Sequence, residues 1–135
     1  MTWHGFVPSD RALPMLNGAL AGLALLHDVP NYRHSMPTKV IEYLAHGVPA
    51  IVTPLPVPAA LVQGSGGGLV VPFGDVDAVV RAVLGLVADP QRARRMGAAG
   101  HAAVAAEYDW DMVAAEFVAA LQHAALQRPT PAGPG

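Results

Sequence analysis

The hydrophobic pattern of the first half of the chain alternates short apolar runs with an amphipathic segment. Residues 21–26 (AGLALL), 50–53 (AIVT) and 68–71 (GLVV) are apolar runs bounded by glycine, proline or polar positions. Such runs suit strands, and residues 21–26 suit one buried on both faces, although periodicity alone leaves a buried helix open there. Between the first two runs, the apolar residues of segment 37–46 recur at the spacing of a helix. This order predicts parallel βαβ units.

The segment from Pro37 to His46 is predicted to be a helix with two faces. A residue before proline avoids helical angles, so Met36 marks the boundary and Pro37 takes the first helical position. Gly47, followed by Pro49, ends the helix. The face expected to pack on the sheet carries Val40, Ile41, Leu44 and Ala45. The face expected to look outward carries Lys39, Glu42, Tyr43 and His46.

Helices are also expected on both sides of this central region. Residues 10–16 suit a short helix capped by Ser9, and residues 59–63 a helical turn after the PLPVP turn. The last part of the chain predicts a helix over 76–88 capped by Asp75, a second that begins at Pro90 after the cap Asp89, and a third over 110–127 preceded by Asp109.

The predicted fold class is α/β: a partial Rossmann-like parallel sheet of three to four strands, with flanking helices and C-terminal helices. We expect one domain over residues 1–127. Residues 128–135, rich in proline and glycine, are expected to be a disordered tail. Three short strands would leave an open sheet edge, which is a site for pairing with another chain.

Composition narrows the function classes. Charged residues make up 13% of the 135 residues, against about 25% in an average domain. Either part of the surface is covered by something else, or alanine occupies exposed helix positions. The net charge of −2 gives no basic footprint for nucleic acid. Absence of cysteine suits a cytoplasmic protein. The uncharged stretch 43–74 is interrupted by five prolines, which argues against a membrane helix.

The candidate site is the loop 28–36 with the helix that follows it. The loop comes after a buried parallel strand, so it should open at the carboxyl edge of the sheet, where α/β folds bind ligands. The amides of Thr38, Lys39 and Val40 and the positive end of the helix dipole would hold a phosphate. Lys39 adds a cation, and Glu42 one turn later could accept hydrogen bonds from a diol. A surface pair between Lys39 and Glu42 is the alternative.

Four segments in order resemble glycosyltransferase family 4 and its relatives. SMPTKVIEYLAHGVPAIVTPLP (35–56) resembles the signature of an acidic residue, seven residues, a Glu, and Ala-x-Gly-x-Pro-Val-Val. GGGLVVPFGDVDAVVRAVLGLVADP (66–90) is similar to a later Gly-x-Leu-Val-x-Pro-x-Asp segment, and EYDWDMVAAEF (107–117) to a terminal Phe-x-Trp helix. HGFVP (4–8) resembles a Gly-x-Val that follows an earlier strand.

The resemblance assigns roles by position. Glu42 matches the acidic residue that holds the ribose hydroxyls of the nucleotide. The other acidic position, which contacts the donor sugar, falls on His34, which departs from the family and equally suits a solvated loop histidine. Residues 35–38 (Ser35, Met36, Pro37, Thr38) match the segment whose amides approach the diphosphate, and Ser35 also suits a plain helix cap. Gly5 and Tyr43 are expected at the rim, Tyr43 alternatively as a packing residue.

The resemblance implies the donor-binding half of a GT-B retaining glycosyltransferase whose substrate is a UDP- or GDP-sugar. No metal or other cofactor is expected. An acceptor domain on the N-terminal side is expected to be missing, together with the first strands of the donor domain, so this chain should have little activity alone. Peripheral membrane association would come only through that missing domain. Two alternatives remain: a non-catalytic module that completes a separately encoded acceptor domain, and a nucleotide-binding regulator.

Overall fold

The computed structural model describes residues 2–126, and its backbone forms two compact units. One unit spans Met1–Ala105 and the other Ala106–Gly135. The first unit contains the sheet and every predicted site residue. The second contains the helix α7 (Trp110–Leu126), where a helix was predicted. The predicted tail, residues 128–135, and the last residue of the predicted helix, Gln127, lie outside the described residues.

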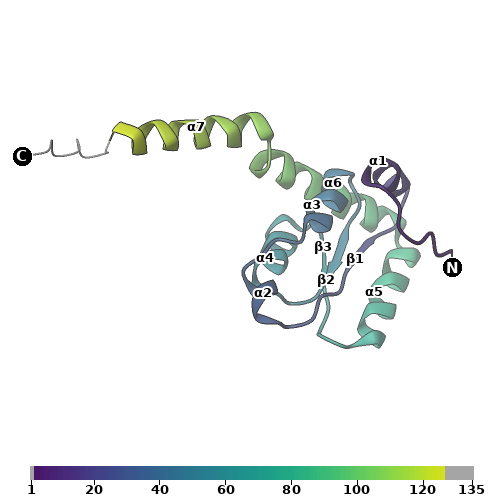
Figure 1. Cartoon of the computed structure of the whole chain (residues 1–135). Coiled ribbons are helices and arrows are strands. Elements are labelled where there is room, and N and C mark those ends of the chain that lie inside the picture. The colour runs from purple at the N-terminus through teal and green to yellow at the C-terminus, as the bar shows by residue number, and fades with distance from the viewer. Residues whose placement is uncertain (1, 127–135) are drawn as a thin grey trace, which may run out of the picture. The chain divides into compact units, whose positions relative to one another are not determined.

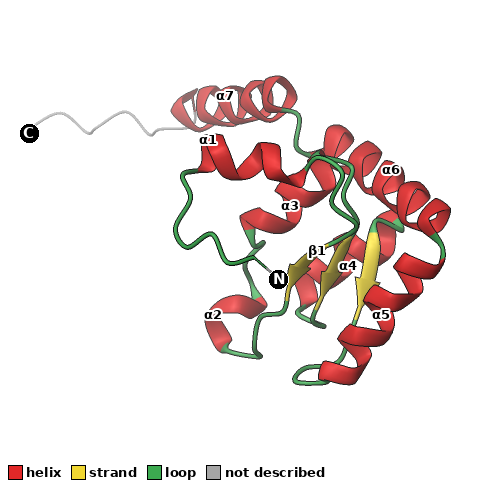
Figure 2. Ribbon diagram, turned by 90° about the vertical axis from the view of Figure 1, so that its right-hand side faces the viewer, coloured by secondary structure: helices red, strands yellow, loops and turns green. Residues whose placement is uncertain are grey.

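Three parallel strands form the sheet of the first unit. They are β1 (Gly22–Ala24), β2 (Ala50–Val52) and β3 (Gly68–Val70), in the spatial order β1-β2-β3. Gly22, Leu23 and Ala24 stand opposite Ala50, Ile51 and Val52, and these stand opposite Gly68, Leu69 and Val70. Figures 1 and 2 show the strands side by side among the helices. The predicted strands and their parallel pairing are confirmed.

Six α-helices and one 3-10 helix lie wholly or mainly in this unit. They are α1 (Ser9–Ala12), the 3-10 helix η1 (Leu13–Leu16), α2 (Pro30–Arg33), α3 (Thr38–Ala45), α4 (Pro56–Ser65), α5 (Val76–Ala88) and α6 (Pro90–Glu107). Asp75 caps α5 through a hydrogen bond to its Oδ1 from the amide of Ala78, 2.8 Å long. The amide of Arg92 donates to Asp89 Oδ1 in the same way at the start of α6, also at 2.8 Å. Both predicted caps are confirmed.

Hydrophobic clusters cover both faces of the sheet. Val40 and Leu44 of α3 and Val62 of α4 pack on one face. Leu86 of α5 and Ala93 of α6 pack on the other. The middle strand β2 is therefore fully buried, as an interior parallel strand should be. At the edge, β1 is not: Leu23 is 43% exposed, so the expectation of a strand buried on both faces is wrong for this residue.

Helix α6 contacts both clusters, because Ala93 belongs to one and Val104 to the other. Its buried positions are Ala93, Gly97, Gly100 and Val104. A methyl group at Gly97 would overlap the Gly47 carbonyl, and one at Gly100 would lie 2.5 Å from Leu44 Cδ2. Glycine is required here by close packing, since neither residue has a positive φ.

Four local predictions need correction. Pro37 is the N-cap of α3, with ψ of 120°, and the helix begins at Thr38; proline's fixed φ suits either position, and only ψ distinguishes them. Ser9 is the first residue of α1 and caps nothing. The expected PLPVP turn instead starts α4 at Pro56, because prolines in a first turn lose no internal hydrogen bond. Ala45, placed on the packed face of α3, is exposed.

No helix among the described residues is long and apolar enough to cross a membrane.

Candidate donor-binding site

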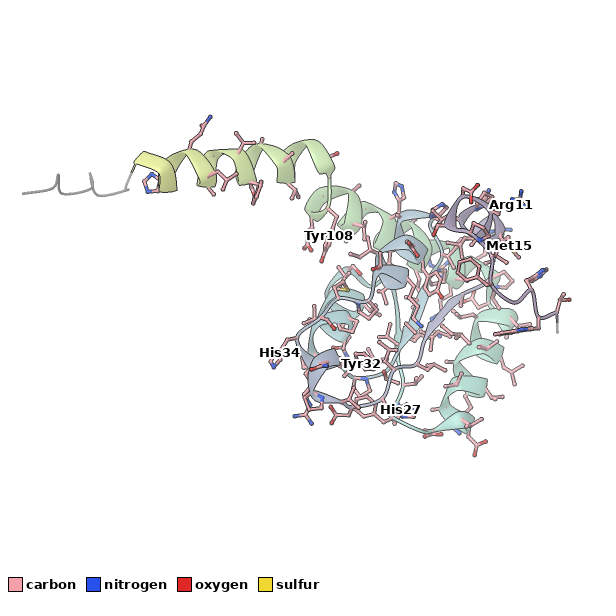
Figure 3. All side chains as sticks on the ribbon, in the orientation of Figure 1. Arg11, Met15, His27, Tyr32, His34 and Tyr108 are labelled. Carbon is pink, nitrogen blue, oxygen red and sulfur yellow. The ribbon has the colours of Figure 1, made fainter. Side chains whose placement is uncertain are left out.

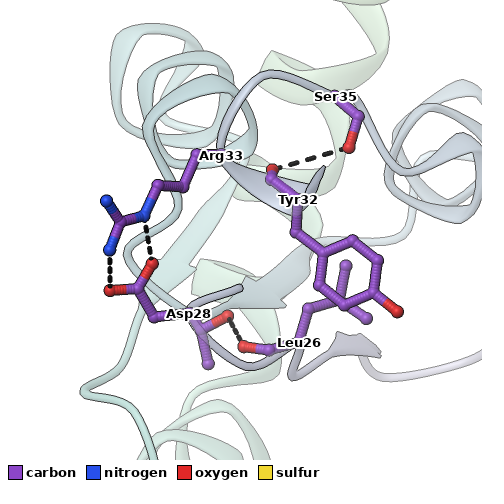
Figure 4. A network of polar contacts seen from close by, with 6 residues as sticks. Leu26, Asp28, Tyr32, Arg33 and Ser35 are labelled. Carbon is purple, nitrogen blue, oxygen red and sulfur yellow. Dashed lines mark hydrogen bonds and ion pairs between the residues drawn. The ribbon is translucent and has the colours of Figure 1, made fainter. Parts of the chain in front are cut away.

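The loop that leaves β1 is held by an ion pair that the hydrophobic pattern did not reveal. Arg33, at the end of α2, donates two hydrogen bonds to Asp28, of 2.6 and 2.8 Å (Figure 4). The hydrogen bonds from Arg33 lower the pKa of the Asp28 carboxyl below its usual value. Both side chains are about half exposed, so the pair orders the loop in a solvated setting.

His34 and Ser35 follow directly on α2. His34 is the exposed C-cap residue of α2, and Figure 3 shows it at the outer surface. The Ser35 hydroxyl donates back to the Asn31 carbonyl at 3.1 Å and lies 3.5 Å from the Tyr32 carbonyl (Figure 4). Ser35 therefore caps the carboxyl end of α2, in agreement with the plain helix cap considered from the sequence, and it does not cap α3.

The amino end of α3 is open to a ligand on the side of its first two residues. Thr38 is exposed and Lys39 partly buried, and amides in a first turn have no acceptor inside the helix. The Val40 amide was also predicted to hold a phosphate. That prediction is wrong, because this amide donates to the Pro37 carbonyl at 2.9 Å. Met36 packs against the cluster beneath α3. Two predicted amides and the Lys39 ammonium thus remain for an anion.

Glu42 lies one turn into α3 and is partly buried. Its backbone carbonyl accepts a hydrogen bond from the His46 ring, but its carboxylate has no hydrogen bond or ion pair among the described residues. Lys39 likewise has no ion pair there. The surface pair between Lys39 and Glu42 that could have explained the pattern does not form. An unpaired, partly buried carboxylate is available for hydroxyl groups of a ligand.

Tyr43 packs against β1 instead of looking outward with Lys39. Its ring occupies the space above Gly22, where any Cβ would overlap it. Its hydroxyl donates to the Leu23 carbonyl at 3.3 Å, on the open edge of the sheet. Burial, with a smaller contribution from the Glu42 charge, raises the pKa of Tyr43. Tyr43 therefore fixes α3 on the strand that precedes the loop.

Tyr43→Phe is expected to lower the free energy of unfolding by about 0.5–1.5 kcal/mol, the usual net value of one hydrogen bond. Because the pKa is raised in the folded state, the stability that neutral Tyr43 contributes is complete below about pH 10 and is lost as pH rises through the folded-state pKa. Urea unfolding of the full chain at pH 8 to 11 should therefore show a shallower alkaline decline in the variant. Exposed Tyr32→Phe is the control, and an identical alkaline decline in wild type and Tyr43→Phe would contradict the assignment.

A hydrogen bond between two strand ends, and a cavity beside it, lie at the carboxyl edge of the sheet, and neither was predicted from the sequence. Thr53, after β2, donates from its buried hydroxyl to the Leu26 carbonyl at 2.7 Å. It lines a cavity of about 140 Å³ with Leu25–His27, Pro72 and Gly74–Val76. The three strand ends thus meet around a mainly apolar hollow. Gly5, predicted at the rim, is exposed in the segment before α1 and does not line this cavity.

Metal-ligating side chains do not gather in the described part of the chain. No group of three or more His, Asp or Glu residues there is placed to hold a metal ion. The polar groups near the amino end of α3 are backbone amides, the Lys39 ammonium and the Glu42 carboxylate, and the exposed His34 imidazole lies just before them in the chain. These are donors for an anion and an acceptor for hydroxyls.

Comparison with known proteins identifies the family to which the chain belongs. A family model described as glycosyl transferase-like matches residues 1–119. The chain belongs to this family. The match includes α3, the loop before it and the whole sheet. The glycosyltransferase assignment made from the four sequence segments is thereby confirmed.

Two relatives show the extent of the similarity. Over 77 residues the chain is 42% identical to a GDP-mannose-dependent alpha-(1-6)-phosphatidylinositol monomannoside mannosyltransferase of Mycobacterium tuberculosis, covering 57% of this chain and 20% of that protein. The structure is similar to sucrose-phosphate synthase from Thermosynechococcus elongatus, with a TM-score of 0.65 and 27% identity over 69% of this chain and 23% of the other. The Rossmann-like α/β fold of this glycosyltransferase-like domain is confirmed, and the chain spans about a fifth of either relative.

Proposed function

We propose that this glycosyltransferase-like domain binds a nucleotide diphosphate sugar at the amino end of α3. The diphosphate lies against the amides of Thr38 and Lys39 and the Lys39 ammonium, and the Glu42 carboxylate accepts hydrogen bonds from the ribose. The observation that carries the proposal is the unpaired Glu42 carboxylate one turn from a helix start without a side-chain cap. A diphosphate attached to a diol satisfies both groups at once.

The donor is proposed to be a GDP-sugar, because the mannosyltransferase relative is named as GDP-mannose-dependent. His34 is proposed to contact the sugar, since it ends α2 directly before the diphosphate-binding segment. Transfer with retention would need an acceptor-binding domain in addition, supplied by a longer chain or a partner. Such transfer depends on positioning and on stabilising the leaving group between two domains, so the domain alone would bind donor with little turnover.

Glu42→Gln is expected to weaken GDP binding about tenfold or more, because hydrogen bonds to a charged acceptor are worth about 1.5–3 kcal/mol. Isothermal titration calorimetry of the full chain with GDP and UDP measures this directly. Glu107→Gln, an exposed carboxylate on α6, is the matched control and should bind as wild type does. Wild-type affinity in Glu42→Gln would remove Glu42 from the site.

A second candidate function is favoured by the open edge of β1. Leu23 and Leu25 are 43% and 38% exposed. The outer backbone groups of an edge strand can pair with another chain, although the Leu23 carbonyl already accepts from Tyr43. The chain would then be a non-catalytic module that completes a separately encoded acceptor domain. Failure of both nucleotides to bind, together with a stable complex with such a domain in native mass spectrometry, would favour this candidate. Nucleotide binding with no transfer in that complex would favour a nucleotide-binding regulator.

A further inference from the structure

A separate cavity lies at the opposite, amino edge of the sheet. Its volume is about 350 Å³, and its walls come from three segments distant in sequence: residues 18–20 before β1, residues 46–49 before β2, and Pro90, Ala93 and Arg94 in α6. Helix α3 runs between the two edges, with Thr38 at one end and His46 just beyond the other. Eight residues of helix span about 12 Å, so this cavity is distinct from the proposed donor site.

Arg94 gives the cavity a fixed positive charge. In its neighbour Arg95, Nη2 lies 3.8 Å from Asp89 Oδ2. Arg94, in contrast, has no ion pair among the described residues. Among the described residues, no Asp or Glu lines the cavity. A guanidinium without a carboxylate partner can form two parallel hydrogen bonds with a phosphate or a carboxylate. The cavity is thus suited to one anionic group.

His46 supplies the second polar group, and its contacts fix its hydrogen-bonding role. Its Nδ1 lies 2.8 Å from the Glu42 carbonyl oxygen. A carbonyl only accepts, so Nδ1 carries a hydrogen, and in the neutral ring Nε2 is then an acceptor. The Nε2 atom is the ring nitrogen left for a ligand, and it is ready to accept a hydrogen bond from a hydroxyl group.

We propose that this cavity binds a small hydroxylated anion, of the size of a sugar phosphate or sugar acid, with Arg94 on the oxyanion and His46 on a hydroxyl. The volume lies at the lower end of small-molecule sites. Leu20, Val48 and Pro49 provide apolar wall for the carbon skeleton. The inference does not depend on the donor site, because none of these residues belongs to the loop 28–36 or the amino end of α3.

The test is a titration of the ¹⁵N-labelled full chain, followed by NMR, with four probes: mannose 6-phosphate, gluconate, mannose and inorganic phosphate. We expect saturable shifts at residues 18–20 and 46–49 with mannose 6-phosphate, with gluconate, or with both, which tells the phosphate from the carboxylate. Mannose and inorganic phosphate should bind at least tenfold more weakly. Arg94→Gln should weaken binding about tenfold or more, from the loss of a charge-assisted pair, and His46→Phe should weaken it while keeping a ring in place.

Two controls separate this site from others. Arg92→Gln changes an arginine of the same helix that does not line the cavity, and Lys39→Gln changes the proposed donor site; both should bind the probe as wild type does. No saturable shift with either hydroxylated anion would overturn the proposal. Unchanged binding in Arg94→Gln would also overturn it, as would shifts confined to the amino end of α3. Equal binding of inorganic phosphate and mannose 6-phosphate would overturn the role of His46 and the ligand class.

Discussion

Gly97→Ala is expected to destabilise the protein by about 2–3 kcal/mol, in the range that overpacking a close contact costs. The added methyl would overlap the backbone carbonyl of Gly47, in the turn before β2. Backbone at that position cannot move freely, because Gly47 donates to the Leu44 carbonyl at 2.9 Å and has a φ of +67°. Helix α6 would have to withdraw from the sheet. Urea unfolding of the full chain measures the change in midpoint.

The matched control is Gly85→Ala in α5. Gly85 also lies inside a helix with a negative φ, but a Cβ there meets no atom within 4 Å. Alanine should therefore stabilise the protein by about 0.5–1 kcal/mol through helix propensity alone. The two substitutions are chemically identical and should change stability in opposite directions. Stabilisation by Gly97→Ala would mean that α6 does not approach the turn as closely as described.

Signals confined to a few neighbouring residues were sufficient to predict much of the fold. Asp75 and Asp89 each precede an amphipathic segment, and each accepts the expected amide hydrogen bond at the start of α5 or α6. Three short apolar runs in a strand-helix-strand order predicted the parallel sheet correctly. Capping joins residues three positions apart in the chain, so a single sequence contains the whole signal.

Predictions failed where a distant contact or a single backbone angle decides. The exposure of Leu23 depends on β1 being at the edge, which its own apolar run cannot reveal. Tyr43 was assigned to the outward face of α3, yet Gly22, far earlier in the chain, leaves space for its ring. Pro37 suits the N-cap and the first helical position equally well until ψ is known.

The candidate donor site could be proposed from the sequence because its residues form one continuous segment. The segment from His34 to Glu42 contains the end of a loop and the start of one helix. These two parts are neighbours in the sequence and are therefore neighbours in the fold. Arg94 and His46 could not be connected in the same way, because they lie far apart in the sequence and come together only in the folded chain. The same holds for Thr53 and Leu26, whose hydrogen bond joins two strand ends.

Leu44→Ala is expected to cost about 2–5 kcal/mol, the range for a buried leucine that leaves a cavity. Leu44 is completely buried on α3, and it contacts the sheet cluster on one side and Gly67 and Gly100 on the other. The same helix carries Lys39 and Glu42, so looser packing should also weaken nucleotide binding at the proposed site. Leu84→Ala is the control, because Leu84 of α5 is 59% exposed. This substitution should change the free energy of unfolding by less than about 0.5 kcal/mol.

The contact between Leu44 and Gly100 allows a stricter test by a double-mutant cycle. Gly100→Ala alone should destabilise, since its Cβ would lie 2.5 Å from Leu44 Cδ2 and 3.3 Å from Cγ. In the Leu44→Ala background those atoms are gone, and the new methyl enters the space that they leave. Residues in contact couple by about 0.5–3 kcal/mol, so the double variant should be more stable than the sum of the single changes predicts. Additive losses would show that α6 and α3 do not share this contact, because two independent sites have no reason to compensate.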